Sequence, residues 1–437
     1  MFKNIFGINK LKIASNTISQ IVAKAISAGA TFVISIIIAK EYGASGYGDF
    51  TKIITFVAFF YLLADFGLNA IYLQLEDEKD LSWWHSLIAI RIVLSFILIF
   101  TLLAIVSFLP SNGENGYTYL VKLGIILFSP TILFQAMITT SNVIFQKKFR
   151  YEFLTASVLC GSIISLVLVY ISSKLFVYNA AIVFIVISLA IGALASTILS
   201  LYFSGKFRKL GFFWNFHKIK KIFIRSIPFG LTLVLNVIYF RIDTFILTIT
   251  RSTAEVGIYG LAYKIFEFPL VFPTFFMNAV YPLMVNEFTK KENSFLKLKS
   301  IVKKSSVFLA TTSFLATTIV WMVAPYVTLI KADFYPSITA LRILSLGLPL
   351  FFLSSLAMWT MIVANKRISL FLIYAISMSM NIIANIMFIP KHGFIAASWI
   401  TVVTELIVLI LSILVIMQFF KQENEKLERK NKHYERK

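Results

Sequence analysis

The sequence has few of the residues that build soluble domains or covalent frameworks. Charged residues make up 14% of the 437 positions, hydrophobic residues 59%, and the mean hydropathy is +0.85. An average soluble domain carries about a quarter charged residues. The single cysteine, Cys160, excludes an internal disulfide and any metal site built from cysteines. The four histidines lie far apart without metal-ligand spacing, so we expect no metal and no cofactor.

The signatures of several enzyme classes are also missing. No G-x-x-x-x-G-K-[ST] loop occurs, so no ATPase of that type is built into the chain. No loop carries the paired carboxylates that would suggest glycosyl transfer, and the segments expected outside the cell are short. We therefore expect no catalytic residues and no enzymatic activity. The N-terminus carries Lys3, Lys10 and Lys12 before a long apolar stretch without a cleavage site, which indicates a retained first helix rather than a signal peptide.

Long apolar runs dominate the chain and predict a helical membrane protein. A spanning helix needs about 20 predominantly apolar residues. By this criterion we expect an all-α protein with twelve transmembrane helices. Pro130, and Pro269, Pro273 and Pro282 in the eighth span, are expected to mark bends. The expected spans are 14–39, 48–74, 83–109, 118–145, 152–173, 179–203, 226–249, 257–286, 305–330, 337–363, 368–389 and 394–420.

The basic residues alternate strongly between the two sides of this topology. With the N-terminus inside, 29 of the 41 Lys and Arg fall in inside segments and 6 in outside segments or at the outer edge of a span. Positively charged loops face the cytoplasm, so both termini are expected there. The net charge of +21 is then explained by topology and by attraction to anionic membrane lipids, and we expect no nucleic acid partner.

The longest inside segment divides the spans six and six. We expect an N-terminal six-helix lobe over 1–203, a basic cytoplasmic linker over 204–225, a C-terminal six-helix lobe over 226–420 and a charged cytoplasmic tail over 421–437. The linker mixes aromatic and basic residues, which favours an amphipathic segment lying on the membrane surface. A Tyr-Gly pair precedes Lys52, and another precedes Lys264 at the same spacing. This similarity is weak evidence for an internal repeat of the two halves.

Among the ionisable residues inside the expected spans, ten are candidates for a functional role, six of them basic and four acidic. Such groups are costly in a bilayer and usually face a bundle interior or an aqueous cavity. A surplus of cations predicts an anionic substrate, and diphosphate fits because Lys and Arg form charge-assisted hydrogen bonds with phosphate oxygens. Snorkelling to the interface or internal ion pairing remains the alternative for several of them. The ten are Lys24, Lys52, Asp65, Arg91, Arg241, Asp243, Lys264, Glu267, Arg342 and Glu405.

Several stretches resemble one known family. The segments IIIAKEYGASGYGDFTKIITF and LADFGLNAIYLQ resemble the opening of the Wzx-type O-antigen and capsule repeat-unit flippases. Residues 227–284 share that family's P-x-G opening, R-x-D, E-V-G-x-Y turn and Y-P exit, and residues 381–405 share its paired asparagines, I-P-x-x-G turn and buried Glu. The resemblance covers nearly the whole chain and implies the multidrug/oligosaccharidyl-lipid/polysaccharide exporter superfamily.

The resemblance implies two six-helix lobes around a central cavity, alternating access, and a bacterial cytoplasmic membrane location. The implied substrate is an undecaprenyl-diphosphate-linked oligosaccharide, moved from the inner to the outer leaflet. A polysaccharide polymerase and a chain-length regulator are expected partners, beside membrane lipids. The related lipid II flippases carry cavity cations on their first, second and eighth helices, where this chain has Lys24, Lys52 and Lys264 in place of arginine.

From these observations we predict a diphosphate site formed by Lys24, Lys52, Lys264 and Arg241. Asp65, Asp243 and Glu405 are the predicted ion-coupling carboxylates. An ion-coupled multidrug exporter of the same superfamily is the nearest alternative function, although a cation-rich cavity disfavours cationic drugs. A membrane glycosyltransferase or polymerase, and a scaffold without transport activity, are further alternatives.

Overall fold

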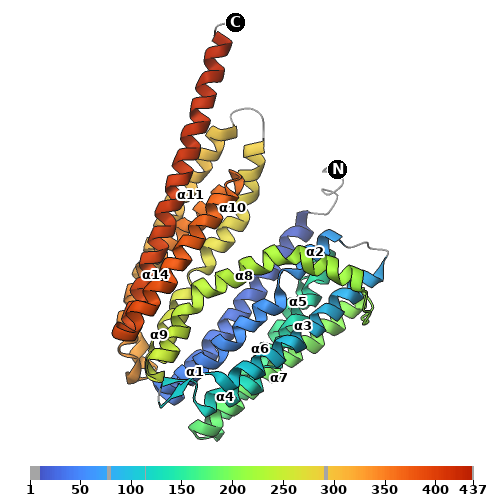
Figure 1. Cartoon of the computed structure of the whole chain (residues 1–437), viewed down its shortest axis with the longest axis vertical. Helices are drawn as coiled ribbons and strands as arrows, with labels where there is room; N and C mark the ends of the chain where they lie inside the picture. Colours follow the sequence, from blue (N-terminus) through green and yellow to red (C-terminus); the bar gives the residue numbers. More distant parts are fainter. Residues whose placement is uncertain (1–9, 76–79, 114, 290–293, 436–437) are drawn as a thin grey trace. The chain divides into compact units, whose positions relative to one another are not determined.

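The computed structural model describes residues 10–75, 80–113, 115–289 and 294–435, which are almost entirely helical (Figure 1). This confirms the all-α fold. The described chain forms two compact units, Met1–Gly257 and Ile258–Lys437. The first contains α1 (Lys10–Asp65), α2 (Leu68–Leu75), α3 (Leu81–Phe108), a hairpin of β1 (Ser111–Asn112) and β2 (Asn115–Gly116), α4 (Tyr119–Phe128), α5 (Thr131–Lys148), α6 (Glu152–Leu175), α7 (Tyr178–Phe207) and α8 (Phe216–Thr250).

The second unit begins within the first turns of α9. Its helices α10, α11 and α13 pack on one another around an apolar core that includes Met277, Leu309 and Phe352, and α14 packs against α13. Its elements are α9 (Thr253–Glu267), α10 (Val271–Thr289), α11 (Ser294–Val323), the short 3-10 helices η2 (Ala324–Leu329) and η3 (Ala332–Phe334), α12 (Ser337–Ser345), α13 (Leu348–Val363) and α14 (Arg367–Glu435).

Nine helical segments within the described residues are long and apolar enough to cross a membrane. Two of them contain a glycine with non-helical backbone angles, Gly43 (φ 67°) and Gly393 (φ 59°), so α1 and α14 each consist of two arms. All twelve expected spans fall on helical segments. The one expected over 226–249 lies in α8, which is not among the nine, so the number of twelve spans stays a prediction.

Proline residues end helices at two of the expected positions. Pro130 lies between α4 and α5, and Pro269 lies between α9 and α10, which confirms the bends predicted there. Pro282 instead lies inside α10, and Pro273 lies near the start of that helix, without a break at either residue. Two further breaks occur without proline. Phe66 and Gly67 have positive φ between α1 and α2, and Leu346 and Gly347 separate α12 from α13.

The segments predicted for one side of the membrane meet within the first unit. From the predicted inside segments, Arg208 donates to the Tyr72 hydroxyl (2.9 Å) and Lys218 pairs with Asp80. From the predicted outside segments, the Tyr42 hydroxyl donates to the Ser173 carbonyl (3.0 Å), and Asn115 forms a β-bridge with Ser252. These contacts join segments that follow one another on the same predicted side, and the orientation in the membrane stays a prediction.

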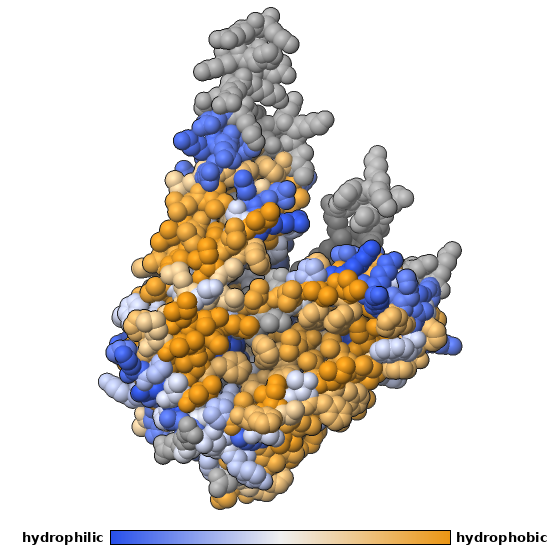
Figure 2. Space-filling model, in the orientation of Figure 1, coloured by the Kyte–Doolittle hydropathy of each residue, from blue (hydrophilic) through white to orange (hydrophobic). Residues whose placement is uncertain are grey.

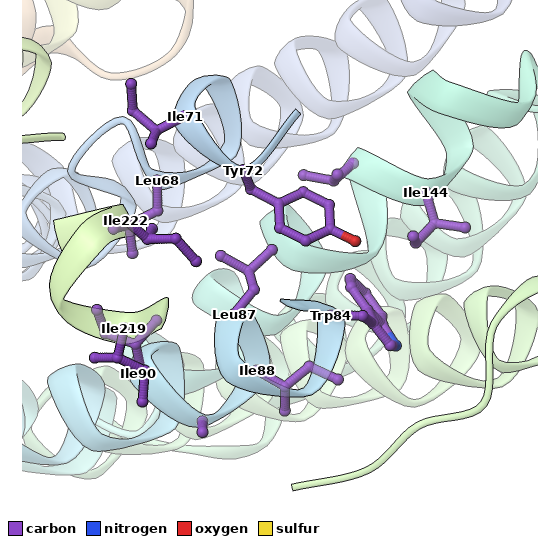
Figure 3. Packing of buried hydrophobic residues seen from close by; sticks show 12 residues of the cluster. Leu68, Ile71, Tyr72, Trp84, Leu87, Ile88, Ile90, Ile144, Ile219 and Ile222 are labelled. Carbon is purple, nitrogen blue, oxygen red and sulfur yellow. The ribbon is translucent and has the colours of Figure 1, made fainter. Parts of the chain in front are cut away.

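The boundary between the units differs from the predicted boundary between lobes. The prediction placed residues 226–257 with the C-terminal lobe, whereas α8 packs along α1 and against α2 and α3 of the first unit. Ile219 and Ile222 near the start of α8 enter an apolar cluster with Leu68 and Leu87 (Figure 3). The start of α8 is thus buried within the first unit, which ends at Gly257 in the first turns of α9, and the predicted lobe boundaries stay a prediction.

Large apolar side chains remain exposed on many helices, including Phe100, Ile163 and Phe314. Figure 2 shows apolar residues covering the middle of the helices on one face, with hydrophilic residues gathered toward helix ends. An apolar surface of this extent suits a lipid environment, in which helices associate through close packing and polar contacts instead of the hydrophobic effect.

Small residues bring α6 and α7 into close contact. A Cβ atom built on Gly192 would lie 1.9 Å from the Ser165 hydroxyl oxygen and 2.6 Å from the Gly161 carbonyl oxygen. A hydrogen bond of 3.1 Å joins the Ser172 and Ser188 hydroxyls along the same contact. Because one obstacle is backbone, a side chain at Gly192 can be accommodated only by separating the two helices.

We predict that Gly192→Ala destabilises the protein by about 1–3 kcal/mol, the usual cost of overpacking a close contact. Thermal unfolding of the purified protein in detergent measures this effect. Gly29→Ala is the matched control, because nothing lies within 4 Å of a Cβ atom at Gly29. Equal melting temperatures for Gly192→Ala and Gly29→Ala would contradict the close packing of α6 on α7.

Candidate functional site

Lys24 lies on the first arm of α1, inside an apolar segment that is long enough to span the membrane. Its side chain is exposed. The arm is held from both ends: the Thr155 hydroxyl donates to the Ser19 carbonyl (2.9 Å), and Tyr42 contacts the end of α6. Lys24 thus projects from a supported helix within the first expected span, and its role as a substrate contact stays a prediction.

Lys52 has a different environment. Its residue is 1% exposed, and its ammonium donates to the Gly116 carbonyl (2.8 Å) and the Thr253 hydroxyl (2.6 Å). Asp49, one turn earlier, is also buried and accepts from the Tyr178 hydroxyl (2.5 Å). In this conformation Lys52 therefore joins α1, the β-hairpin and the first residue of α9, instead of facing open space.

Arg241 and Asp243 lie on α8, two residues apart and on different faces. Arg241 is half-buried, whereas Asp243 is 4% exposed. The Asp243 carboxylate accepts from the Thr244 backbone N–H (2.6 Å) and hydroxyl (3.2 Å). The helix that carries them packs against α1, with Phe245 in edge contact with Phe56. Arg241 is therefore the more accessible of the two charges.

Asp65 lies at the end of α1 and pairs with Arg91 of α3. The Arg91 side chain is completely buried and donates to Asp65 (3.1 Å), the Ala64 carbonyl (2.9 Å) and the Asn69 side chain (2.6 Å). These bonds bracket the break at Phe66 and Gly67, so the guanidinium holds α1 and α2 together. The sequence analysis identified both charges but not their pairing.

The second unit contributes Lys264 and Glu405. Lys264 is half-buried on α9. Glu405, on the second arm of α14, is 3% exposed and accepts from the Ser354 hydroxyl. The adjacent Thr404 accepts from the Asn381 amide (3.2 Å), and Asn381 in turn accepts from Asn385 (2.8 Å). A polar cluster thus lies inside the apolar helices α13 and α14.

Only part of this polar cluster could be predicted from the sequence. The paired asparagines and Glu405 were marked by the family resemblance, and their spacing of four places Asn381 and Asn385 on one helix face. Ser354 was missed, because a single serine in an apolar helix carries no signal of its partner. Tertiary packing alone brings it to Glu405.

Solved structures with the same fold are transporters. The chain has a TM-score of 0.70 with the lipid II flippase MurJ in an inward closed conformation, at 16% identity, covering 92% of this chain and 89% of that one. An inward-facing multidrug resistance MATE family transporter of the MOP superfamily gives 0.72, at 14% identity, covering 92% and 99%. A MOP superfamily transporter from Pyrococcus furiosus gives 0.59, at 14% identity, covering 94% and 95%.

These likenesses define the fold as that of the MOP superfamily of transporters and show a multi-pass membrane protein. The sequence pattern of the family described as polysaccharide biosynthesis protein matches residues 13–287, more than half of the chain. The chain belongs to this family, which confirms the predicted resemblance to Wzx-type polysaccharide flippases. No protein of curated function matches the sequence.

We predict that Lys52→Ala lowers the free energy of unfolding by about 1–3 kcal/mol, because it leaves a buried carbonyl and hydroxyl without their donor. Thermal unfolding in detergent measures the loss. Lys40→Ala, at an exposed lysine of the same predicted outer side, serves as control and is expected to change stability little. If Lys52→Ala is as stable as wild type yet inactive in export, Lys52 acts on the substrate instead.

Proposed function

We propose that this protein moves undecaprenyl-diphosphate-linked oligosaccharide repeat units from the inner to the outer leaflet of the bacterial cytoplasmic membrane, for O-antigen or capsule synthesis. Membership of the polysaccharide biosynthesis family carries the proposal. A fold shared with a lipid II flippase supports it, because that relative handles a lipid-linked sugar. Alternating access, with both termini in the cytoplasm, is part of the proposal.

The intramembrane cations supply the chemistry for a diphosphate. Three of the predicted cations have side chains that are not enclosed: Lys24 is exposed, and Arg241 and Lys264 are half-buried. Cations inside a membrane protein usually face a bundle interior or a cavity, and Lys and Arg form charge-assisted hydrogen bonds with phosphate oxygens, so these three side chains suit an anionic ligand. Lysine binds phosphate as a point charge without the bidentate geometry of arginine, which favours release after translocation. We assign diphosphate contact to these three residues and a positioning role to Lys52.

The buried carboxylates are the candidates for coupling to an ion gradient. Asp65 already neutralises Arg91, so we assign coupling to Asp243 and Glu405 instead. Both are nearly completely buried, and each accepts a hydrogen bond from a hydroxyl. A carboxylate in such a place changes its energy strongly when it takes up a proton or a sodium ion.

The test in cells is export of surface polysaccharide by a flippase-deleted bacterium that carries this gene. Wild type is expected to restore the polymer, whereas Lys24→Ala and Lys264→Ala, at equal membrane levels, lower export by about tenfold or more, the worth of one charge-assisted hydrogen bond. Lys40→Ala is the matched control and should export normally. Failure of wild type with several repeat-unit structures, together with a gain of drug resistance, would leave the fold assignment intact and overturn the substrate.

A second prediction concerns coupling. In vesicles with an imposed sodium or proton gradient, wild type is expected to translocate faster than without it, and Glu405→Gln to lose this dependence while it retains basal translocation. Asp65→Asn should keep the gradient dependence but melt at a lower temperature, because it leaves buried Arg91 without its counter-charge. Full gradient dependence in Glu405→Gln would remove Glu405 from the coupling site.

A further inference from the structure

The first turns of α8 are fixed on the first unit by one face. The Asn215 side chain accepts from the Lys218 backbone N–H (3.1 Å) and so caps the helix. Ile219 and Ile222 are buried against α2 and α3, as Figure 3 shows, and Ser226 continues this buried face one turn later. These contacts fix the rotation of α8 about its axis. They therefore also determine which side chains lie on its opposite face.

That opposite face is basic and concave. A cavity of about 500 Å³ is lined by His217, Lys220, Lys221, Ile224 and Arg225. All five residues are exposed. Their positions follow the helical repeat of three and four, which gathers them on one side of α8. We call these five residues the basic face.

The positive charge of the basic face is poorly compensated by its own segment. No Asp or Glu occurs between residues 204 and 242. Asp80 already forms an ion pair with Lys218. The hydrogen bonds that Lys218 and Ser82 donate to the Asp80 carboxyl lower its pKa to about 2. Lys221 lies 5.8 Å from the Trp83 ring, and Lys220 and Arg225 form no ion pair with any residue that the structure describes.

The surroundings of the basic face place it at the level of lipid headgroups. Phe212, Phe213, Trp214 and Phe216 precede it, each between 47% and 68% exposed. Aromatic side chains gather at membrane interfaces, where one end is apolar and the other meets water. The expected span 226–249 begins directly after Arg225. The cations thus lie between an exposed aromatic segment and a membrane-spanning helix.

We propose that the basic face is a binding site for the headgroup of an anionic phospholipid, whose phosphate lies among Lys220, Lys221 and Arg225. From His217 to Arg225 the cations extend over about 12 Å of helix, longer than a single phosphate needs. Ile224 lies among them, and Phe223 and Ile227 flank them, exposed. Apolar neighbours add nothing for a free anion in water, whereas they contact the acyl chains of a lipid. Such a lipid would hold the segment between α7 and α8 at the membrane surface.

The test is a lipid titration of the full-length protein in detergent, with bound lipids counted by native mass spectrometry. Phosphatidylglycerol is expected to bind at least about tenfold more tightly than phosphatidylcholine, because each Lys or Arg adds roughly 1 kcal/mol near anionic headgroups. Lys220→Gln/Lys221→Gln/Arg225→Gln should lose this preference. The matched control is Lys299→Gln/Lys303→Gln/Lys304→Gln, which removes the same charge from exposed positions of α11 and should keep the preference.

Three results would overturn the proposal. The first is an unchanged preference for phosphatidylglycerol in the basic-face variant, with its melting temperature equal to wild type. The second is displacement of phosphatidylglycerol by millimolar inorganic phosphate or by equimolar undecaprenyl diphosphate, which would indicate a free-anion or substrate site. The third concerns Glu76, Asp77 and Glu78, which lie outside the described residues. A gain of about tenfold in lipid affinity on their conversion to amides would show that carboxylates occupy the basic face.

Discussion

The cost of a charge inside the membrane governs the arrangement of this protein. Each ionised group at bilayer depth needs a counter-charge, a set of hydrogen bonds or access to water. Arg91 is enclosed and has Asp65, Asn69 and a carbonyl as partners. Lys52 is enclosed and has a carbonyl and a hydroxyl. These contacts join separate helices, so the same bonds that make the charges tolerable also determine how the first unit is assembled.

Lys24, Arg241 and Lys264 differ from Arg91 and Lys52 because their side chains are not fully buried. Lys24 is exposed, and Arg241 and Lys264 are half-buried, which is why we propose these three as the substrate contacts. The chain belongs to the polysaccharide biosynthesis family, and it shares its fold with solved structures of transporters. The substrate that we propose, an anionic lipid-linked sugar, carries a diphosphate that can accept hydrogen bonds from these cations. The lipid site that we propose on the basic face of α8 depends on the same attraction between cations and phosphate, here at the membrane surface.

Hydropathy predicted the helical segments well, because lipid requires each backbone group to be satisfied within a helix. Pro130 and Pro269 marked helix breaks for a local reason, the missing N–H group. Partners could not be predicted in this way. Lys52 binds a carbonyl of a hairpin 64 residues away, and Arg91 pairs 26 residues back along the chain. The packing of Ile219 and Ile222 against the first unit is likewise a tertiary contact, which no local pattern encodes.

Reconstitution tests the central claim most directly. Purified protein is placed in vesicles with an undecaprenyl-diphosphate-linked oligosaccharide in one leaflet, and the fraction of sugar that becomes accessible on the other side to an added glycosidase is measured over time. We expect protein-dependent translocation of this lipid and none of the same oligosaccharide on an uncharged lipid. Translocation no faster than in protein-free vesicles, together with uptake of a cationic dye, would contradict the assignment as a flippase of lipid-linked sugars.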